Sequence, residues 1–192
     1  MSAKESKASA GCDRCCIALL RAVNVGGRSV AMADLRTMLA ELGCGNPRTL
    51  LQSGNAVFML KGQMSPAAFE EKLEAQAQRR FGLPVAFMLR SATEWDATIA
   101  RNPFPDAARS DPAHLLLMAL KRAPTAAAVN ALCDGYNGPE TIHVAGRDAY
   151  LIYPEGIGRS KLTNALIERK LGVAGTARNW NTVLKLAALA HT

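Results

Sequence analysis

The chain has 192 residues, of which 49% are hydrophobic and 20% are charged, and its formal net charge is +7. This length fits one domain or two small halves that share a core, and the composition predicts a folded globular protein. No apolar run reaches the length of a membrane span, and the run at residues 15–20 lacks the cleavage pattern of a signal peptide. We therefore expect a cytoplasmic protein that does not bind membranes, with a flexible N-terminus over residues 1–14.

The first half of the chain has the pattern of alternating strands and helices. Strands are predicted at 17–23, 49–52, 56–60 and 85–89, with a tight turn at Ser53-Gly54-Asn55 between the second and the third. Helices are predicted at 32–42, which Gly43 ends, and after the cap at Ser65-Pro66, which Gly82 ends. The resulting order is β-α-β-β-α-β, and a further helix is predicted near 92–100.

The second half repeats this order. Strands are predicted at 115–120, 141–144, 150–153 and 176–178, and helices at 125–133, from a Ser160 cap to Gly172, and at 182–190, with Asn181 or Thr182 as the last cap. Corresponding elements lie about 90 to 97 residues apart. The predicted fold class is α+β: a tandem duplication of two ferredoxin-like β-α-β-β-α-β units, each followed by an extra helix, over residues 15–103 and 104–192.

Five cysteines are present, at positions 12, 15, 16, 44 and 133. An odd number of cysteines without an export signal predicts reduced thiols. Cys12 and Cys15 form a CxxC pair beside Cys16, but the four ligands of a zinc site are not visible. We expect no metal and no cofactor, and the role of this cysteine cluster stays open.

Polar residues of the first unit gather in two segments that the topology places at one end of its sheet. The loop after the first strand and the central turn both lie there, and glycine amides with a helix N-terminus suit an anion. Turn geometry alone also explains glycine, asparagine and serine at such places. The candidate residues are Arg21, Asn24, Gly26, Gly27, Arg28, Gln52, Ser53 and Asn55.

Polar residues of the second unit gather at the opposite end of its sheet. The segment Gly156-Ile157-Gly158-Arg159-Ser160-Lys161 follows the third strand, and the run from Arg178 to Asn181 leaves the fourth. Free amides and three cations there suit an anion, although Ser160 alone could cap the helix while Trp180 packs in the core. The candidate residues are Arg159, Ser160, Lys161, Arg178, Asn179, Trp180 and Asn181.

Four blocks of the sequence resemble the hallmark motifs LLRGxNVGG, SGNxxF, SKLT and TxRNWNT of the domain-of-unknown-function 1697 family. They fall at residues 19–27, 53–58, 160–163 and 176–182, with Ala22 in place of the usual glycine, and CDRCC at the N-terminus has no counterpart. The resemblance runs from Ile17 to about Leu189. It implies a bacterial cytosolic protein with a duplicated ferredoxin-like architecture, and it supplies no activity.

Three functions are compatible with these residues. The first is a binding module for an anionic partner such as a nucleotide, phosphate or nucleic acid, with Lys185 among its cations and Trp180 as a stacking surface. The second is an enzyme for a phosphorylated or nucleotide small molecule, in a cleft between the halves lined by Asn24, Ser53, Asn55, Lys161 and Asn179.

The third function is structural, and the polar blocks then hold the two halves together. Complete catalytic signatures are absent, and the three histidines lie apart from the polar blocks in the sequence, so a binding module is favoured over an enzyme. The sequence does not predict an oligomeric state.

Overall fold

The computed structural model describes residues 13–21, 24–25, 28–62 and 64–192. The predicted flexible N-terminus therefore lies outside the described residues, except for Asp13 and Arg14. Arg14 belongs to the first strand. Cys12 also lies outside the described residues.

The first unit contains the following elements: β1 (Arg14–Arg21), β2 (Asn24–Val25), β3 (Arg28–Ser29), α1 (Met32–Glu41), β4 (Gly45–Thr49), β5 (Asn55–Leu60), α2 (Pro66–Phe81), β6 (Ala86–Ser91) and α3 (Ala92–Ala100). The second contains α4 (Pro105–Ser110), β7 (Leu115–Leu120), α5 (Ala126–Asp134), β8 (Thr141–Ala145), β9 (Asp148–Ile152), α6 (Asn164–Leu171), β10 (Gly175–Asn179) and α7 (Trp180–Ala190).

Each unit has one four-stranded antiparallel sheet. The strand order is β4-β5-β1-β6 in the first sheet and β10-β7-β9-β8 in the second. In both sheets the first long strand lies between the third and the fourth, so the two units share one topology. The prediction of an α+β protein with two similar halves is confirmed, and the ferredoxin-like assignment of each half stays a prediction.

The central strands are buried on both faces because helices cover both sides of each sheet. Along β1, Ile17 and Leu19 pack toward one side, while Cys16, Ala18 and Leu20 pack toward α1 and α2 on the other. This alternation follows from the two-residue period of a strand. The strand β7 has the same pattern, with its second face toward α5 and α6.

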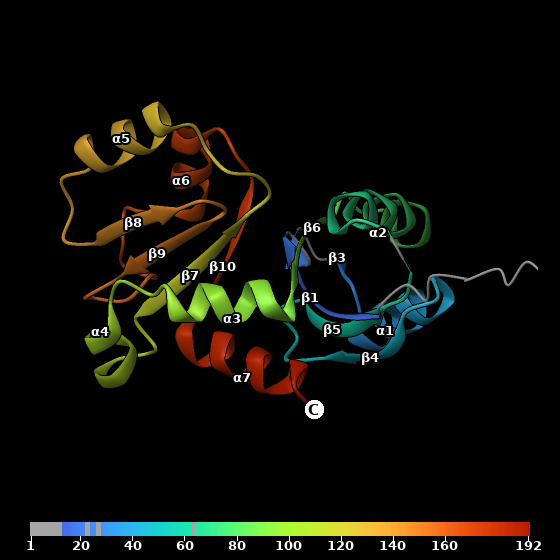
Figure 1. The fold of residues 1–192 in the computed structure, drawn as a ribbon. Coiled ribbons are helices and arrows are strands. Elements are labelled where there is room, and N and C mark those ends of the chain that lie inside the picture. Colours follow the sequence, from blue (N-terminus) through green and yellow to red (C-terminus); the bar gives the residue numbers. More distant parts are fainter. Residues whose placement is uncertain (1–12, 22–23, 26–27, 63) are drawn as a thin grey trace, which may run out of the picture.

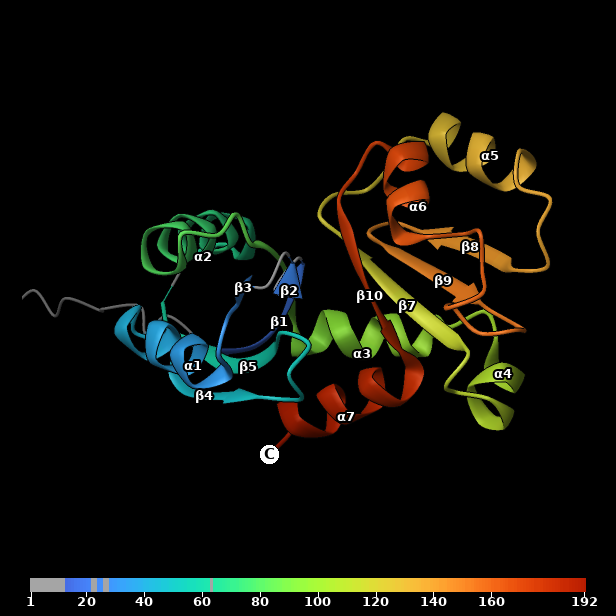
Figure 2. The ribbon, with the colours of Figure 1, turned by 180° about the vertical axis from the view of Figure 1, so that it is seen from behind.

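Helices α3 and α7 form a layer that the two units share. They run side by side across both units in the two opposite views (Figures 1 and 2). The indole nitrogen Nε1 of Trp95 in α3 donates to the carbonyl of Val183 in α7 at 3.1 Å, and both residues are fully buried. The same apolar cluster holds Ile17 of the first sheet and Leu117 of the second, so the apolar core is continuous across the predicted boundary at 103/104.

Most of the predicted helix ends are found in place, and two caps differ. Ser65 caps α2, and Gly82 ends it in the left-handed conformation, as predicted. Thr163 rather than Ser160 caps α6, and Asn179 rather than Asn181 or Thr182 caps α7. In both cases a second Ser, Thr or Asn stands within three residues of the predicted cap, and its side chain accepts the bond from the first turn of the helix.

The strand predicted at 49–52 is wrong. The strand β4 begins at Gly45 and ends at Thr49, and its pairing with β5 shifts register between Gly45 and Arg48. Leu51 is exposed and has a positive φ of 59°, which a strand does not allow. The sequence also gave no sign of the short hairpin of β2 and β3 or of helix α4, which are too short to show a period.

Candidate functional site

The side chain of Arg178 crosses from the second unit into the first. It leaves β10 and is only 9% exposed. Its Nε donates to Oδ1 of Asn55 at 2.5 Å, and one terminal nitrogen, Nη2, donates to backbone oxygens of the first unit. These acceptors are the carbonyls of Leu20 at 3.0 Å, Ser53 at 2.8 Å and Gly54 at 3.1 Å.

The remaining donors of Arg178 stay within its own strand. They bind Oγ1 of Thr176 and the carbonyl of Ala177, both at 2.8 Å. All of these acceptors are uncharged, and burial lowers the pKa of Arg178 to about 10. The guanidinium is thus protonated at neutral pH, and its five N–H groups already have acceptors within the protein.

The turn that receives Arg178 is held by its own side chains. Asn55 is fully buried, and its Nδ2 donates to the carbonyl of Leu50 and to Oγ of Ser53, both at 2.9 Å. Gln52 and Ser53 are exposed at the turn. The predicted first-unit cluster therefore contains a turn whose buried polar atoms serve the contact with Arg178.

A second polar contact joins the two units. Arg21 at the end of β1 makes two bonds to Glu168 of α6, from Nε to Oε1 at 2.5 Å and from a terminal nitrogen to Oε2 at 2.8 Å. The backbone N–H of Gly175 also donates to Oε1 of Glu168, at 2.8 Å. The hydrogen bond to Glu168 raises the pKa of Arg21. We call these contacts of Arg21 and Arg178 the polar seam.

The rest of the RNWN run has local roles. The side chain of Asn179 accepts from the backbone N–H of Thr182 at 3.0 Å and so caps α7. Trp180 is 3% exposed and packs near Tyr150, with ring centroids 6.4 Å apart. Asn181 is exposed on the first turn of α7. Capping and core packing therefore account for two of these three residues.

The loop predicted from Asn24 to Arg28 is described only in part. Its ends form the hairpin of β2 and β3, in which Asn24 pairs with Ser29 and Val25 with Arg28. Gly26 and Gly27 lie outside the described residues, and the structure does not describe the side chains of Asn24 and Arg28. Their predicted contact with a ligand stays a prediction.

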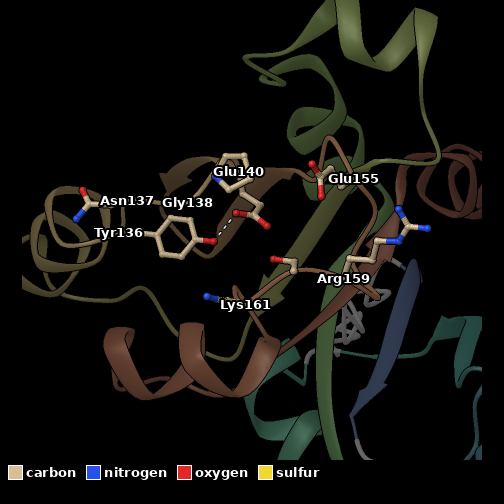
Figure 3. A pocket seen from close by; sticks show the side chains of 9 residues that line it. Tyr136, Asn137, Gly138, Glu140, Glu155, Arg159 and Lys161 are labelled. Atoms are coloured by element: carbon tan, nitrogen blue, oxygen red, sulfur yellow. Dashed lines mark hydrogen bonds between the residues drawn. The ribbon is translucent and has the colours of Figure 1, made fainter.

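Three candidates of the second unit line an open pocket of about 430 Å³. It lies between the segment that follows α5 and the segment that precedes α6 (Figure 3). Arg159, Ser160 and Lys161 contribute from one side, and Arg178 and Asn179 are not part of its wall. The wall consists of Tyr136, Asn137, Gly138, Pro139, Glu140, Glu155, Arg159, Ser160 and Lys161, and we call it the α5–α6 pocket.

The SKLT block has three structural residues and one cation directed at the pocket. Oγ of Ser160 accepts from the backbone N–H of Leu162 at 2.9 Å, and Thr163 caps α6. Leu162 is fully buried, and its carbonyl accepts from the hydroxyl of Tyr153 at 3.0 Å. Lys161 is exposed, and its side chain has no hydrogen bond or ion pair with any other described residue. The structural roles thus leave only Lys161 of this block unexplained.

The opposite wall holds a hydroxyl–carboxylate pair that the sequence did not single out. The hydroxyl of Tyr136 donates to Oε2 of Glu140 (Figure 3). A Cβ at Gly138 would overlap the Tyr136 hydroxyl and lie 2.6 Å from Oε2 of Glu140, so this pair requires a glycine there. Burial, followed by the bond to Glu140, raises the pKa of Tyr136. The turn residues Asn137-Gly138-Pro139 were the only sequence signal for this wall.

No cysteine or histidine is among the described residues that line the α5–α6 pocket. Burial raises the pKa of Cys16 to about 12 and that of Cys44 to about 11. Within the described part of the chain, no group of three His, Cys, Asp or Glu residues could hold a metal ion. None of the described helices has the length and apolarity needed to cross a membrane.

Comparison with known proteins identifies a family but not an activity. A search of curated proteins gave no significant match. A solved structure titled as that of conserved bacterial protein SP0830 from Streptococcus pneumoniae is similar in fold, with a TM-score of 0.76 and 21% identity. The alignment covers 94% of this chain and all of that one.

The sequence profile of a protein family of unknown function, DUF1697, matches residues 14–150. This range includes β1 and the turn at 53–55, which supply the first-unit side of the polar seam. The SKLT and RNWNT blocks follow it in the chain. The match extends over more than half of the sequence, and the chain therefore belongs to the DUF1697 family.

Proposed function

We propose that this protein binds a small anionic molecule in the α5–α6 pocket, and that the polar seam holds its two units together without contacting the ligand. The proposal rests on which basic side chains already have partners within the protein and which do not. Arg159 and Lys161 line the pocket and have no carboxylate partner among the described residues. In contrast, all N–H groups of Arg178 already donate to acceptors within the protein.

The donors and acceptors of the pocket favour a ligand with an anionic group. Lys161 offers three N–H donors and Arg159 five, and a phosphate or carboxylate accepts such bonds strongly. Figure 3 shows the amine of Lys161 directed across the pocket toward Tyr136 and Glu140, whereas the guanidinium of Arg159 points away from them. An anionic group is therefore expected beside Lys161.

The acidic residues of the pocket narrow the ligand class. Glu155 lines the pocket and has no hydrogen bond or ion pair with another described residue. Its carboxylate is an acceptor for hydroxyl or amino groups, so the ligand we propose carries donors as well as an anionic group. A nucleotide combines these features, and the pocket volume of about 430 Å³ is within the range of small-molecule sites.

Binding is favoured over catalysis by the chemistry of the wall. The described wall residues include neither histidine nor cysteine, and the Tyr136 hydroxyl already donates to Glu140. The enzyme alternative required a cleft lined by Asn24, Ser53, Asn55, Lys161 and Asn179. Instead, Asn55 binds Arg178 and Asn179 caps α7, away from Lys161. A cytoplasmic location is part of the proposal, supported by the free thiols of the four described cysteines.

Calorimetric titration of the full-length protein with inorganic phosphate and with ribonucleoside monophosphates tests the proposal. We expect Lys161→Ala to weaken nucleotide binding by about tenfold or more, since it removes a charge-assisted hydrogen bond. Lys170→Ala, on the exposed face of α6, is the matched control and should bind like the wild type. Equal affinities of wild type and Lys161→Ala would refute the pocket assignment. If a short oligoribonucleotide bound more strongly than a mononucleotide, the ligand would be a nucleic acid and not a small molecule.

A further inference from the structure

A second pocket lies at the junction of the two units, and none of its residues belongs to the α5–α6 pocket or the polar seam. Its volume is about 340 Å³. One side comes from β6 and α3 of the first unit, and the other from the turn between β8 and β9 of the second. The lining residues are Arg90, Glu94, Ala97, Thr98, Arg101, Ala145, Gly146, Arg147 and Asp148, and we call it the junction pocket.

Three of the four carboxylate oxygens of the junction pocket already accept bonds from protein donors. Asp148 is buried, and its Oδ1 accepts from Arg90 at 3.2 Å while its Oδ2 accepts from the hydroxyl of Thr98 at 2.8 Å. The Oε2 atom of Glu94 accepts from the backbone N–H of Ser91 at 2.7 Å, as part of the capping box of α3. These carboxylates therefore have bonds that a ligand would have to displace.

The donors of the junction pocket are in excess. Arg101 is 61% exposed, and its contact with Oδ2 of Asp148 is 3.6 Å long, which is an ion pair but too long for a hydrogen bond. Arg147 donates from one terminal nitrogen to Glu70 at 3.1 Å, while its Nε is buried without a partner among the described residues. Each guanidinium carries five N–H groups, so unmatched donors remain on both side chains.

Arg90 closes the floor of the junction pocket and joins its two sides. Its guanidinium is 3% exposed and donates to the carbonyl of Arg147 at 2.7 Å and to that of Leu120 at 3.2 Å. These bonds fix the backbone that carries Arg147. Arg101 and Arg147 therefore have more unused N–H donors than the pocket has unused carboxylate oxygens, so the pocket lacks acceptors.

We propose that the junction pocket binds an oxyanion group, phosphate or carboxylate, between the guanidiniums of Arg101 and Arg147. Arginine forms paired, charge-assisted bonds with both groups. Arg101 follows the last residue of α3, and Arg147 lies on the turn of the second sheet, so the oxyanion bridges the two units. Binding stabilises their native arrangement, because only that arrangement presents both arginines to one ion.

The test is a titration of the full-length protein with inorganic phosphate, and separately with acetate, at ionic strength matched with sodium chloride. We expect an oxyanion to raise the melting temperature and to shift the Nε–H resonance of Arg147. Arg101→Gln removes an exposed side chain and should weaken binding by about tenfold or more without preventing folding. Arg79→Gln, on the exposed end of α2, is the matched control.

The two pockets give separable outcomes. Lys161→Ala should leave the Arg147 resonance shift intact, so the junction pocket is tested whether or not the α5–α6 pocket binds its ligand. Arg147→Lys keeps the charge but loses the planar fork, and partial retention of affinity is expected. Titration of Arg101→Gln with an unchanged affinity, or phosphate effects that disappear only in Lys161→Ala, would overturn the proposal. A response to acetate as strong as that to phosphate identifies the bound group as a carboxylate.

Discussion

Arg178 and Asn55 are 123 positions apart in the chain and lie in different units, yet Nε of the arginine donates to Oδ1 of the asparagine at 2.5 Å. Both side chains are buried, and no carboxylate of the described residues forms an ion pair with this arginine. Carbonyl dipoles of the first unit solvate the guanidinium in place of water. The cation therefore stabilises the contact between the units only when every one of these oxygens is in place.

Arg178→Ala is predicted to destabilise the protein strongly. The carbonyls of Leu20, Ser53 and Gly54 lose a shared donor, and we expect the free energy of unfolding to fall by about 3 kcal/mol. The melting temperature should then fall by about 6 to 12 °C. Calorimetry measures the change, with Arg169→Ala on the exposed face of α6 as the control. A melting temperature equal to that of the wild type would mean that the seam does not stabilise the fold.

Asn55→Ala and Arg178→Ala are predicted to be non-additive. The two residues belong to one hydrogen-bond network, so either change already breaks their contact. In a double-mutant cycle the double variant should be more stable than the sum of the single losses predicts, by about 1 to 2 kcal/mol. Denaturant unfolding of the four proteins gives this difference, and strict additivity would place the two residues in independent contacts.

Gly138→Ala is predicted to disturb the Tyr136–Glu140 pair without unfolding the protein. The new Cβ displaces the Tyr136 hydroxyl, which is the end of a movable side chain. Loss of the bond to Glu140 lowers the pKa of Tyr136 toward its ordinary value. Ultraviolet titration can follow this, because burial raises the pKa values of both Tyr150 and Tyr153.

Gly158→Ala is the control for this change, since a Cβ there meets no atom within 4 Å. It lies in the segment before Ser160, next to the pocket residue Arg159. An identical tyrosine titration in both variants would show that Gly138 is not needed to position Tyr136.

Alkaline pH is predicted to destabilise the protein through two buried thiols. Burial raises the pKa of Cys16 from 9.0 to about 12 and that of Cys44 from 9.0 to about 11, so the unfolded chain loses these protons first. Their contribution is therefore fully present below pH 9 and is lost progressively between pH 9 and about 12. Denaturant unfolding at about pH 8 and about pH 10 measures the loss.

Substitution separates these thiols from other groups that titrate at alkaline pH. Cys16→Ala should flatten the pH dependence, whereas Cys133→Ala, at an exposed position on α5, should change it little. If thiolate absorbance appeared at the same pH in the native and the denatured protein, the two thiols would not be protected by burial.

The elements of this fold could be predicted where their signals are local. The cap at Ser65, the stop at Gly82 and the apolar strand at 115–120 each depend on residues close together in the sequence, and all three were found in place. The error at 49–52 arose because Leu50 and Leu51 resemble a strand. Only the tertiary structure shows that Leu50 packs on the core while Leu51 turns outward.

The candidate site was harder to predict because its partners are distant or have no side-chain signature. The sequence marks Arg178 as an unusual residue, but its acceptors include three backbone carbonyls, which any residue supplies. Lys161 was found from its motif, whereas Tyr136 lies 25 positions earlier in the chain and joins it only through the packing of α5 beside α6.

The shared layer of α3 and α7 also has a consequence for synthesis on the ribosome. Ile17, Leu19 and Val57 face Trp95 of α3 and Val183 of α7, in a single apolar cluster. When the nascent chain has emerged only as far as α3, helix α7 is not yet synthesised and cannot pack on the first sheet. That face of the sheet then stays partly exposed to water and to chaperones. The first unit is translated first but completes its core last, when the final helix arrives.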